Sequence, residues 1–238
     1  MRKKLLANWF TRAAHPWSKL GTLFVTLLVY GLSYEQLERG ARLAASNLQV
    51  FWAHEWWRAW SALFVHADLV HLFSNTPLLV LFTYLLWRFF GPWMVASAFA
   101  LCGVMNILVL TTMPPETRLL GASGVVHFMG ALWLTLYVLI ERRDQLTQRF
   151  AAALFLTLML FTPDAYRPEV SYLSHLLGYV MGLLWGGMVY YAGQRYFSSF
   201  ERWLIEAEPE PDFEWRTPEQ LAVAEADPAV RPLEDETF

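Results

Sequence analysis

Long apolar runs separated by short polar segments dominate the chain as far as about residue 195. A helix needs about 20 predominantly apolar residues to cross a hydrocarbon core of roughly 30 Å. Six runs are candidates: 20–34, 69–87, 91–112, 119–140, 150–162 and 172–193. The first needs residues 16–19 and the fifth needs residues 146–149 to reach across, and no strand-like alternation competes with any of them. The pattern therefore predicts an all-α, polytopic membrane protein with a six-transmembrane-helix bundle.

Composition supports this class and divides the chain into three parts. Of the 238 residues, 56% are hydrophobic and only 16% are charged, whereas soluble domains average about 45–50% apolar and about 25% charged residues. We expect a basic N-terminal flank over 1–19, a membrane domain over 20–197, and an acidic tail over 198–238. The tail is rich in proline and carboxylates, which predicts disorder. The bilayer is the expected environment, and no nucleic-acid partner is expected.

The distribution of basic residues predicts the orientation in the membrane. With the N-terminus inside, the inner flanks hold eleven Lys and Arg and the outer loops hold five. Because cytoplasmic loops carry the excess of cations, we expect both termini in the cytoplasm. This bias fits a bacterial inner membrane, although the acid-free basic start also fits an organelle transit peptide. The first outer loop, 35–68, contains the tryptophan-rich stretch FWAHEWWRAW, which suits the headgroup level.

Polar residues inside apolar runs are functional candidates, because burying them in lipid is costly. The stretch FVHADLVHLFSN holds His66, His71 and Asn75. His71 and Asn75 are four residues apart and share one helix face, while His66 lies off that face. Pro77 is expected to kink this span or weaken its hydrogen bonding. The alternative is that these side chains only join neighbouring helices through hydrogen bonds.

A serine between glycines begins the fourth run, in the stretch Gly121-Ala-Ser-Gly124. Glycine permits tight turns and close backbone approach. A helix N-terminus presents unpaired N–H groups that favour negative charge. Ser123 could therefore attack a carbonyl while nearby N–H groups receive the oxyanion. Alternatively, these small residues only pack one helix against another.

A histidine precedes a stripe of small residues in the sixth run, SHLLGYVMGLLWGG. Gly178, Gly182 and Gly186 recur every four residues, which is typical of close helix contact. His175 lies near the same face, at the same membrane depth as Ser123, and could act as its base. His127 lies one turn after Ser123; it could orient His175, donate a hydrogen bond, or simply be buried.

The stretches WWRAWSALFVHADLVHLFSN, GASG and HLLGYVMG, in this order across six predicted spans, resemble the rhomboid family of intramembrane serine proteases. The resemblance covers residues 20–195. It implies a serine endopeptidase that cleaves transmembrane segments of membrane proteins near the outer face, without a cofactor or metal. By the same resemblance, Trp57 and Arg58 match a structural element at the membrane surface.

The resemblance also implies a role for each polar residue. Ser123 would be the nucleophile and His175 the general base, with no carboxylate partner. His71 and Asn75 would point at the oxyanion, helped by the Ser123 N–H. Supporting positions are His66, Gly121, Gly124, His127, Gly178 and Gly182. The glycine stripe would bring the sixth span against the fourth.

Two positions depart from the family pattern. Family members often carry a tyrosine where this chain has His127, so we expect the aromatic platform for His175 to be lost. Ser174 stands where alanine is frequent. With a histidine at position 127, the chain also resembles the rhombosortase branch of the family, which processes the C-terminal sorting tails of exported proteins.

Two other functions remain open from the residues alone. Histidines 66, 71, 127 and 175 could hold Zn²⁺ in an intramembrane metal-binding or transport protein, although no carboxylate or cysteine stands at ligand spacing. The lone Cys102 also allows no intrachain disulfide. The chain could instead be a catalytically inactive rhomboid-like protein that binds transmembrane clients.

Overall fold

Helices form most of the protein in the computed structural model, which describes residues 2–40, 42–161 and 171–206. The long helices are α1 (Ser18–Arg39), α3 (Leu69–Phe90), α4 (Pro92–Leu110), α5 (Ser123–Ile140), α6 (Leu146–Phe161) and α7 (Tyr172–Ser198). Each coincides with one predicted apolar run. The predicted helical membrane protein is therefore confirmed.

Four of these helices, α3, α4, α5 and α7, are long and apolar enough to cross a membrane. Helix α6 is apolar but has 16 residues, and α1 has 22 residues but is less apolar. The protein is thus an integral, multi-pass membrane protein, and the number of six crossings stays a prediction.

The described part of the chain divides into two units, one of residues 5–203 and one that contains residues 2–4 and 204–206. Strands β1 (Arg2–Ala7) and β4 (Arg202–Glu206) pair in a two-stranded sheet. The sequence pattern did not predict these strands, and β4 occupies the start of the tail that composition predicts to be disordered. The rest of that predicted tail, 207–238, lies outside the described residues.

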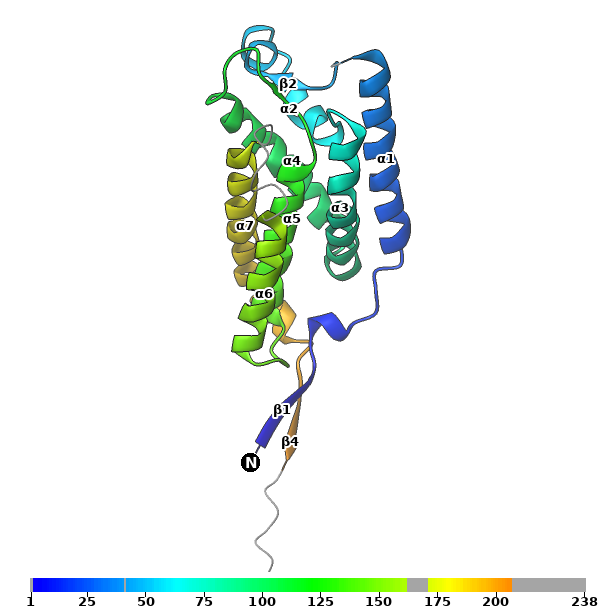
Figure 1. Ribbon diagram of the computed structural model, residues 1–238. Coiled ribbons are helices and arrows are strands. Elements are labelled where there is room, and N and C mark those ends of the chain that lie inside the picture. The colour runs from blue at the N-terminus through cyan, green and yellow to red at the C-terminus, as the bar shows by residue number, and fades with distance from the viewer. Residues whose placement is uncertain (1, 41, 162–170, 207–238) are drawn as a thin grey trace, which may run out of the picture. The chain divides into compact units, whose positions relative to one another are not determined.

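Helix α5 is the centre of the 5–203 unit. It packs against α3, α4, α6 and α7, and most of its residues are buried. Helix α1 lies at the edge of the bundle beside α3 (Figure 1). A central helix with Ser123 as its first residue places that serine where several other helices begin or end.

The glycine stripe of α7 packs closely against α5, as predicted. A methyl group at Gly178 would clash with the carbonyl oxygen of Gly124, and one at Gly182 with that of Phe128. One at Gly186 would lie 2.8 Å from Thr135 Cβ. Only glycine lets the two backbones approach this closely. The contact holds the first turn of α7 beside the first turn of α5.

The segment between α1 and α3 folds over one end of the bundle. It contains β2 (Ala45–Ser46), a π-helical turn (Leu48–Trp52), α2 (Arg58–Ser61) and a 3-10 turn (Ala62–Phe64). Strand β2 pairs antiparallel with β3 (Arg118–Leu119), with Ala45 opposite Leu119.

Arg58 holds this segment together from within. Its largely buried guanidinium contacts Glu55 and donates to the carbonyl oxygens of Arg42 and Ala44. Its neighbour Trp57 is half exposed. These contacts fit a structural role for Arg58. The location of Trp57 and Arg58 at the membrane surface remains a prediction.

Helix α3 continues through Pro77 from Leu69 to Phe90, and the expected kink or weakened hydrogen bonding at this proline stays a prediction. The helix begins at a cap that the sequence analysis missed: the Asp68 carboxylate accepts a hydrogen bond from the His71 N–H at 2.8 Å. An aspartate directly before an apolar run is a recognised N-cap signal. This cap fixes where His71 and Asn75 stand in the first two turns.

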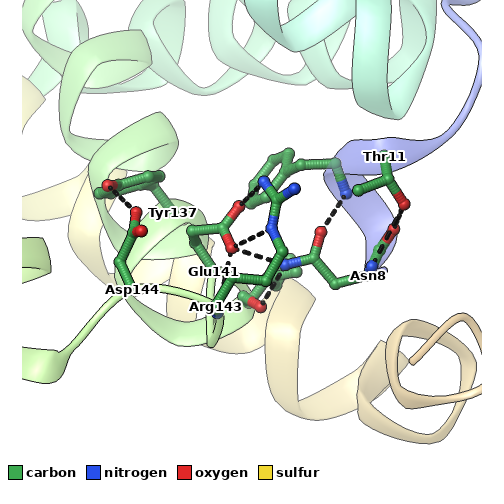
Figure 2. Close-up of polar contacts among 8 residues, drawn as sticks. Asn8, Thr11, Tyr137, Glu141, Arg143 and Asp144 are labelled. Carbon is green, nitrogen blue, oxygen red and sulfur yellow. Dashed lines mark hydrogen bonds and ion pairs between the residues drawn. The ribbon is translucent and has the colours of Figure 1, made fainter. Parts of the chain in front are cut away.

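A buried carboxylate joins the N-terminal segment to the far end of α5 (Figure 2). The Asn8 amide donates to Glu141 Oε1 at 2.9 Å. Arg143 donates to both oxygens of Glu141, at 2.8 and 2.7 Å. Asn8 and Thr11 also cap each other in the 3-10 turn Trp9–Thr11. Because Glu141 is buried, these bonds must satisfy its charge.

Candidate active site

A cavity of about 690 Å³ opens where α3, α5 and α7 begin. Its lining includes the four residues predicted to carry out catalysis and bind the oxyanion: Ser123, His175, His71 and Asn75. Gly121, Gly124 and Ser174 line it as well. Residues from three separate runs of the sequence therefore share one cavity, at one end of the bundle.

Ser123 is the first residue of α5, preceded by a tight turn. Gly121 has φ +123°, a conformation that L-residues with side chains rarely adopt. A methyl group there would also lie 2.8 Å from Cε1 of His71. The Gly121 N–H donates to the carbonyl oxygen of Ala62 at 2.9 Å, which fastens the turn to the preceding segment. The first N–H groups of α5 thus lie beside the cavity without helical acceptors.

His175 lies in the first turn of α7 and is buried. Its backbone N–H donates to the carbonyl oxygen of Ser171 at 3.2 Å. The hydroxyl of Ser171, the N-cap, lies 2.9 Å from that of Ser174. Ser174 therefore has a structural role at the start of this helix. The glycine contacts one turn later hold His175 against α5.

His127 stacks on His175, contrary to the expectation that its presence removes an aromatic platform. The ring centroids lie 4.1 Å apart and the planes differ by 13°. Nδ1 of His127 lies 2.8 Å from the carbonyl oxygen of Ser123. A carbonyl oxygen only accepts, so Nδ1 carries the proton. The imidazole itself is a planar surface against His175, anchored on the backbone of Ser123.

His66 is completely buried and connects three segments. Its Nε2 accepts from the Ala122 N–H at 3.3 Å, so its Nδ1 carries the proton of the neutral ring. Nδ1 donates to the Ser33 hydroxyl at 3.0 Å, and Ser33 donates to the carbonyl oxygen of Phe64 at 3.2 Å. Burial, assisted by nearby His71, lowers the pKa of His66 to about 3, which keeps the ring neutral. The chain of bonds ties α1 to the turn before Ser123.

His71 and Asn75 lie on one face of α3, as predicted, and both line the cavity. The ring of His71 meets that of His66 edge to face, with centroids 5.0 Å apart. The Asn75 amide donates one hydrogen bond to the His71 carbonyl oxygen at 3.2 Å. An amide has two N–H donors, so Asn75 can make a second bond within the cavity.

One polar residue of the cavity was missed by the sequence analysis. Asn106 is buried within α4, and its amide donates to the Ala59 carbonyl oxygen at 2.8 Å. A single asparagine inside an apolar span is a signal that could have identified it. Its bond links α4 to α2 beside the cavity wall.

The histidines do not form a metal cluster in the part of the chain that the structure describes. There, no three or more His, Cys, Asp or Glu side chains are grouped to hold an ion. His66 uses both ring nitrogens in bonds to Ala122 and Ser33, and His127 uses Nδ1 toward Ser123. This geometry does not favour the metal-binding alternative.

Comparison with known proteins identifies the family of this chain. Residues 53–192, more than half of the chain, match the family described as "Rhomboid domain". The chain belongs to the rhomboid family. A protein of Bacillus subtilis (strain 168) named "Putative rhomboid protease YdcA" is 27% identical over 133 residues, covering 55% of this chain and 65% of that relative. The rhomboid chain thus spans slightly less than two thirds of its relative's length.

Proposed function

We propose that this rhomboid protein is an intramembrane serine endopeptidase that cleaves transmembrane segments of other membrane proteins. The observation that carries the proposal is the shared cavity of Ser123 and His175, at the beginning of two helices that glycine contacts hold together. A serine needs a base to become a nucleophile, and His175 is the histidine of α7 in that cavity. The family and the name of the Bacillus relative support the same function.

In the proposed reaction, His175 accepts the Ser123 hydroxyl proton as Oγ attacks the substrate carbonyl carbon. The carbonyl electrons move to the oxygen and form a tetrahedral oxyanion. His175 then gives the proton to the leaving nitrogen as the C–N bond breaks, which leaves an ester on Ser123. A water molecule, deprotonated by the same histidine, hydrolyses the ester and restores both residues.

The oxyanion would be held by groups of residues that line the cavity. These are the Ser123 N–H at the start of α5, the amide of Asn75 and the ring of His71. Preorganised donors at such a position usually contribute most to the lowering of the barrier. His127 would act as a positioning residue, because its ring touches His175 and Ser123 rather than the cavity.

The proposal includes the membrane arrangement. The cavity would face the outer side of a bacterial inner membrane, with six crossings and both termini in the cytoplasm, as the excess of inner basic residues suggests. Residues 20–197 would form the membrane domain between the basic flank 1–19 and the acidic tail 198–238. Substrate helices would be cut near the outer face.

A fluorophosphonate probe, which reacts with activated serines, tests the proposal on the purified full-length protein. The wild type should be labelled, and Ser123→Ala and His175→Ala should not. Ser174→Ala is the matched control, because Ser174 lines the same cavity but bonds to Ser171; labelling should persist. An unlabelled wild type that still binds a transmembrane client would favour the inactive, client-binding alternative.

A further inference from the structure

A second cavity, of about 780 Å³, lies where α3 ends and α4 begins, beside the last turns of α7. Its lining includes Arg88 of α3, whereas His71 of the same helix lines the first cavity. Seventeen residues of helix rise about 25 Å at about 1.5 Å per residue, close to the roughly 30 Å of a hydrocarbon core. The second cavity therefore lies at the opposite membrane face from Ser123.

Basic side chains gather at this second cavity. Arg12, His15 and Arg88 line it, and none of the described lining residues is acidic. The guanidinium of Arg12 lies over the rings of Trp9 and Phe200, at 4.0 and 4.5 Å.

Arg88 has polar and aromatic neighbours rather than an acidic partner. It donates to the Tyr84 hydroxyl at 2.9 Å and lies 5.1 Å from the Phe89 ring centre. Among the residues that the structure describes, the ion pairs use other arginines: 39, 58, 142 and 143. Both cavity guanidiniums thus lack a carboxylate partner within 2–40, 42–161 and 171–206.

The remaining walls are aromatic and apolar. Trp93, Trp185 and Met188 line the cavity, and Trp93 is half exposed. Tryptophan is enriched where hydrocarbon meets headgroups. A site with guanidiniums beside apolar walls, at headgroup depth, matches an amphiphile with a negative head and hydrocarbon chains.

We propose that this cavity binds the phosphate-bearing headgroup of an anionic phospholipid from the adjacent leaflet. Guanidiniums match phosphate oxygens through paired N–H donors, and basic pockets between transmembrane helices suit anionic headgroups. The apolar walls would cover the upper part of the acyl chains. A free phosphate ion would leave those walls in contact with water, so the lipid is the better occupant.

Native mass spectrometry of the full-length protein in detergent tests this, with phosphatidylglycerol and phosphatidylcholine of identical acyl chains. The wild type should retain phosphatidylglycerol preferentially. We expect each guanidinium that contacts the headgroup to contribute a factor of about five to affinity. Arg88→Gln should therefore weaken phosphatidylglycerol binding about fivefold, and the double variant Arg12→Gln/Arg88→Gln about 25-fold. Binding of phosphatidylcholine, whose choline cation offsets the charge of its phosphate, should be weakened less.

Arg195→Gln is the matched control. Arg195 is an exposed arginine in the last part of α7, outside the cavity lining, and its substitution removes the same charge. It should leave lipid preference as in the wild type. Arg88→Gln keeps the test valid if loss of the Arg12 stacking disturbs folding. Within the described residues, the Arg88 side chain donates one hydrogen bond, to Tyr84, and the substitution leaves the backbone bond from the His15 N–H in place.

Several outcomes would overturn the proposal. Equal retention of both lipids by the wild type would do so, as would an Arg195→Gln effect as large as that of Arg88→Gln. Displacement of phosphatidylglycerol by millimolar inorganic phosphate would assign the cavity to a free anion. If the lipid preference emerged only after deletion of 207–238, the occupant of the cavity in the full-length protein would be that acidic segment. None of these readouts depends on proteolysis by Ser123.

Discussion

The imidazole ring of His127 lies parallel to that of His175, with 4.1 Å between the ring centres, while its Nδ1 bonds to the carbonyl oxygen of Ser123. One side chain therefore contacts both members of the proposed catalytic pair. A flat ring at this position restricts how the His175 ring can rotate, which a two-residue pair without a carboxylate requires.

His127→Ala should lower turnover about three- to tenfold, because a stacked aromatic pair contributes about 0.5–1.5 kcal/mol. His127→Tyr should retain most of the activity, since it keeps a planar ring beside His175. The measurement is cleavage of a transmembrane model substrate, with kcat and KM determined separately. Equal losses in both variants would argue against a stacking role.

Asn75→Ala should reduce kcat by about 10²–10³-fold with little change in KM, because an oxyanion donor acts mainly in the transition state. Ser123→Ala should abolish cleavage altogether. Asn75→Asp, which keeps the size but loses the donor, should resemble the alanine variant. If Asn75→Ala were as inactive as Ser123→Ala, Asn75 would have to be more than an oxyanion donor.

Gly178→Ala should destabilise the protein by about 1–3 kcal/mol, the usual cost of overpacking, because the added methyl group would clash with the carbonyl oxygen of Gly124. Gly187→Ala is the control on the same helix, since a methyl group there meets nothing within 4 Å. Thermal unfolding in detergent compares the two. Cleavage should fall only in Gly178→Ala, because His175 is displaced with the helix.

Protonation of Glu141 should lower the stability of the folded protein in acid. Burial alone would raise the pKa of this carboxyl, but the hydrogen bonds and charge of Arg143, with the Asn8 amide, hold it below the ordinary 4.5. The ionised group therefore stabilises the fold above about pH 4.5, and this contribution is lost as pH falls through the lowered pKa.

Glu141→Gln should cost about 2 kcal/mol near neutral pH, as expected for hydrogen bonds to a charged group, and should flatten the decline in stability between neutral pH and acid. The measurement is the unfolding midpoint of the wild type and of Glu141→Gln at a series of pH values from neutral to acid. Glu38→Gln, at an exposed position on α1, should keep the wild-type profile. An unchanged slope in Glu141→Gln would mean that other carboxyls cause the acid sensitivity.

The helices and the gathering of Ser123, His175, His71 and Asn75 could be predicted because their signals are local. Apolar run length marks a span, and polar residues near the same ends of their runs indicate a common depth. The glycine spacing in α7 likewise indicates a close helix contact, although its partner came only from the family resemblance.

The orientation of His127 could not be predicted, because stacking depends on the distance between α5 and α7 and on two side-chain rotamers. The contacts of His66 with Ser33 and Ala122 join segments 33 and 56 residues away, and no pattern along the chain encodes such pairings. The contact of Asn8 with Glu141, across 133 residues, has the same origin. Each depends on how whole helices are placed.

Gly121 combines a positive φ with the imidazole of His71 close to where a side chain would start. Random mutagenesis aimed at new peptide preferences should therefore recover nothing but the parental residue at this site. Tolerated substitutions should instead be found at Val70, Met113 and Leu120, which line the same cavity. Libraries built to change the substrate preference of the proposed protease would begin with those three codons.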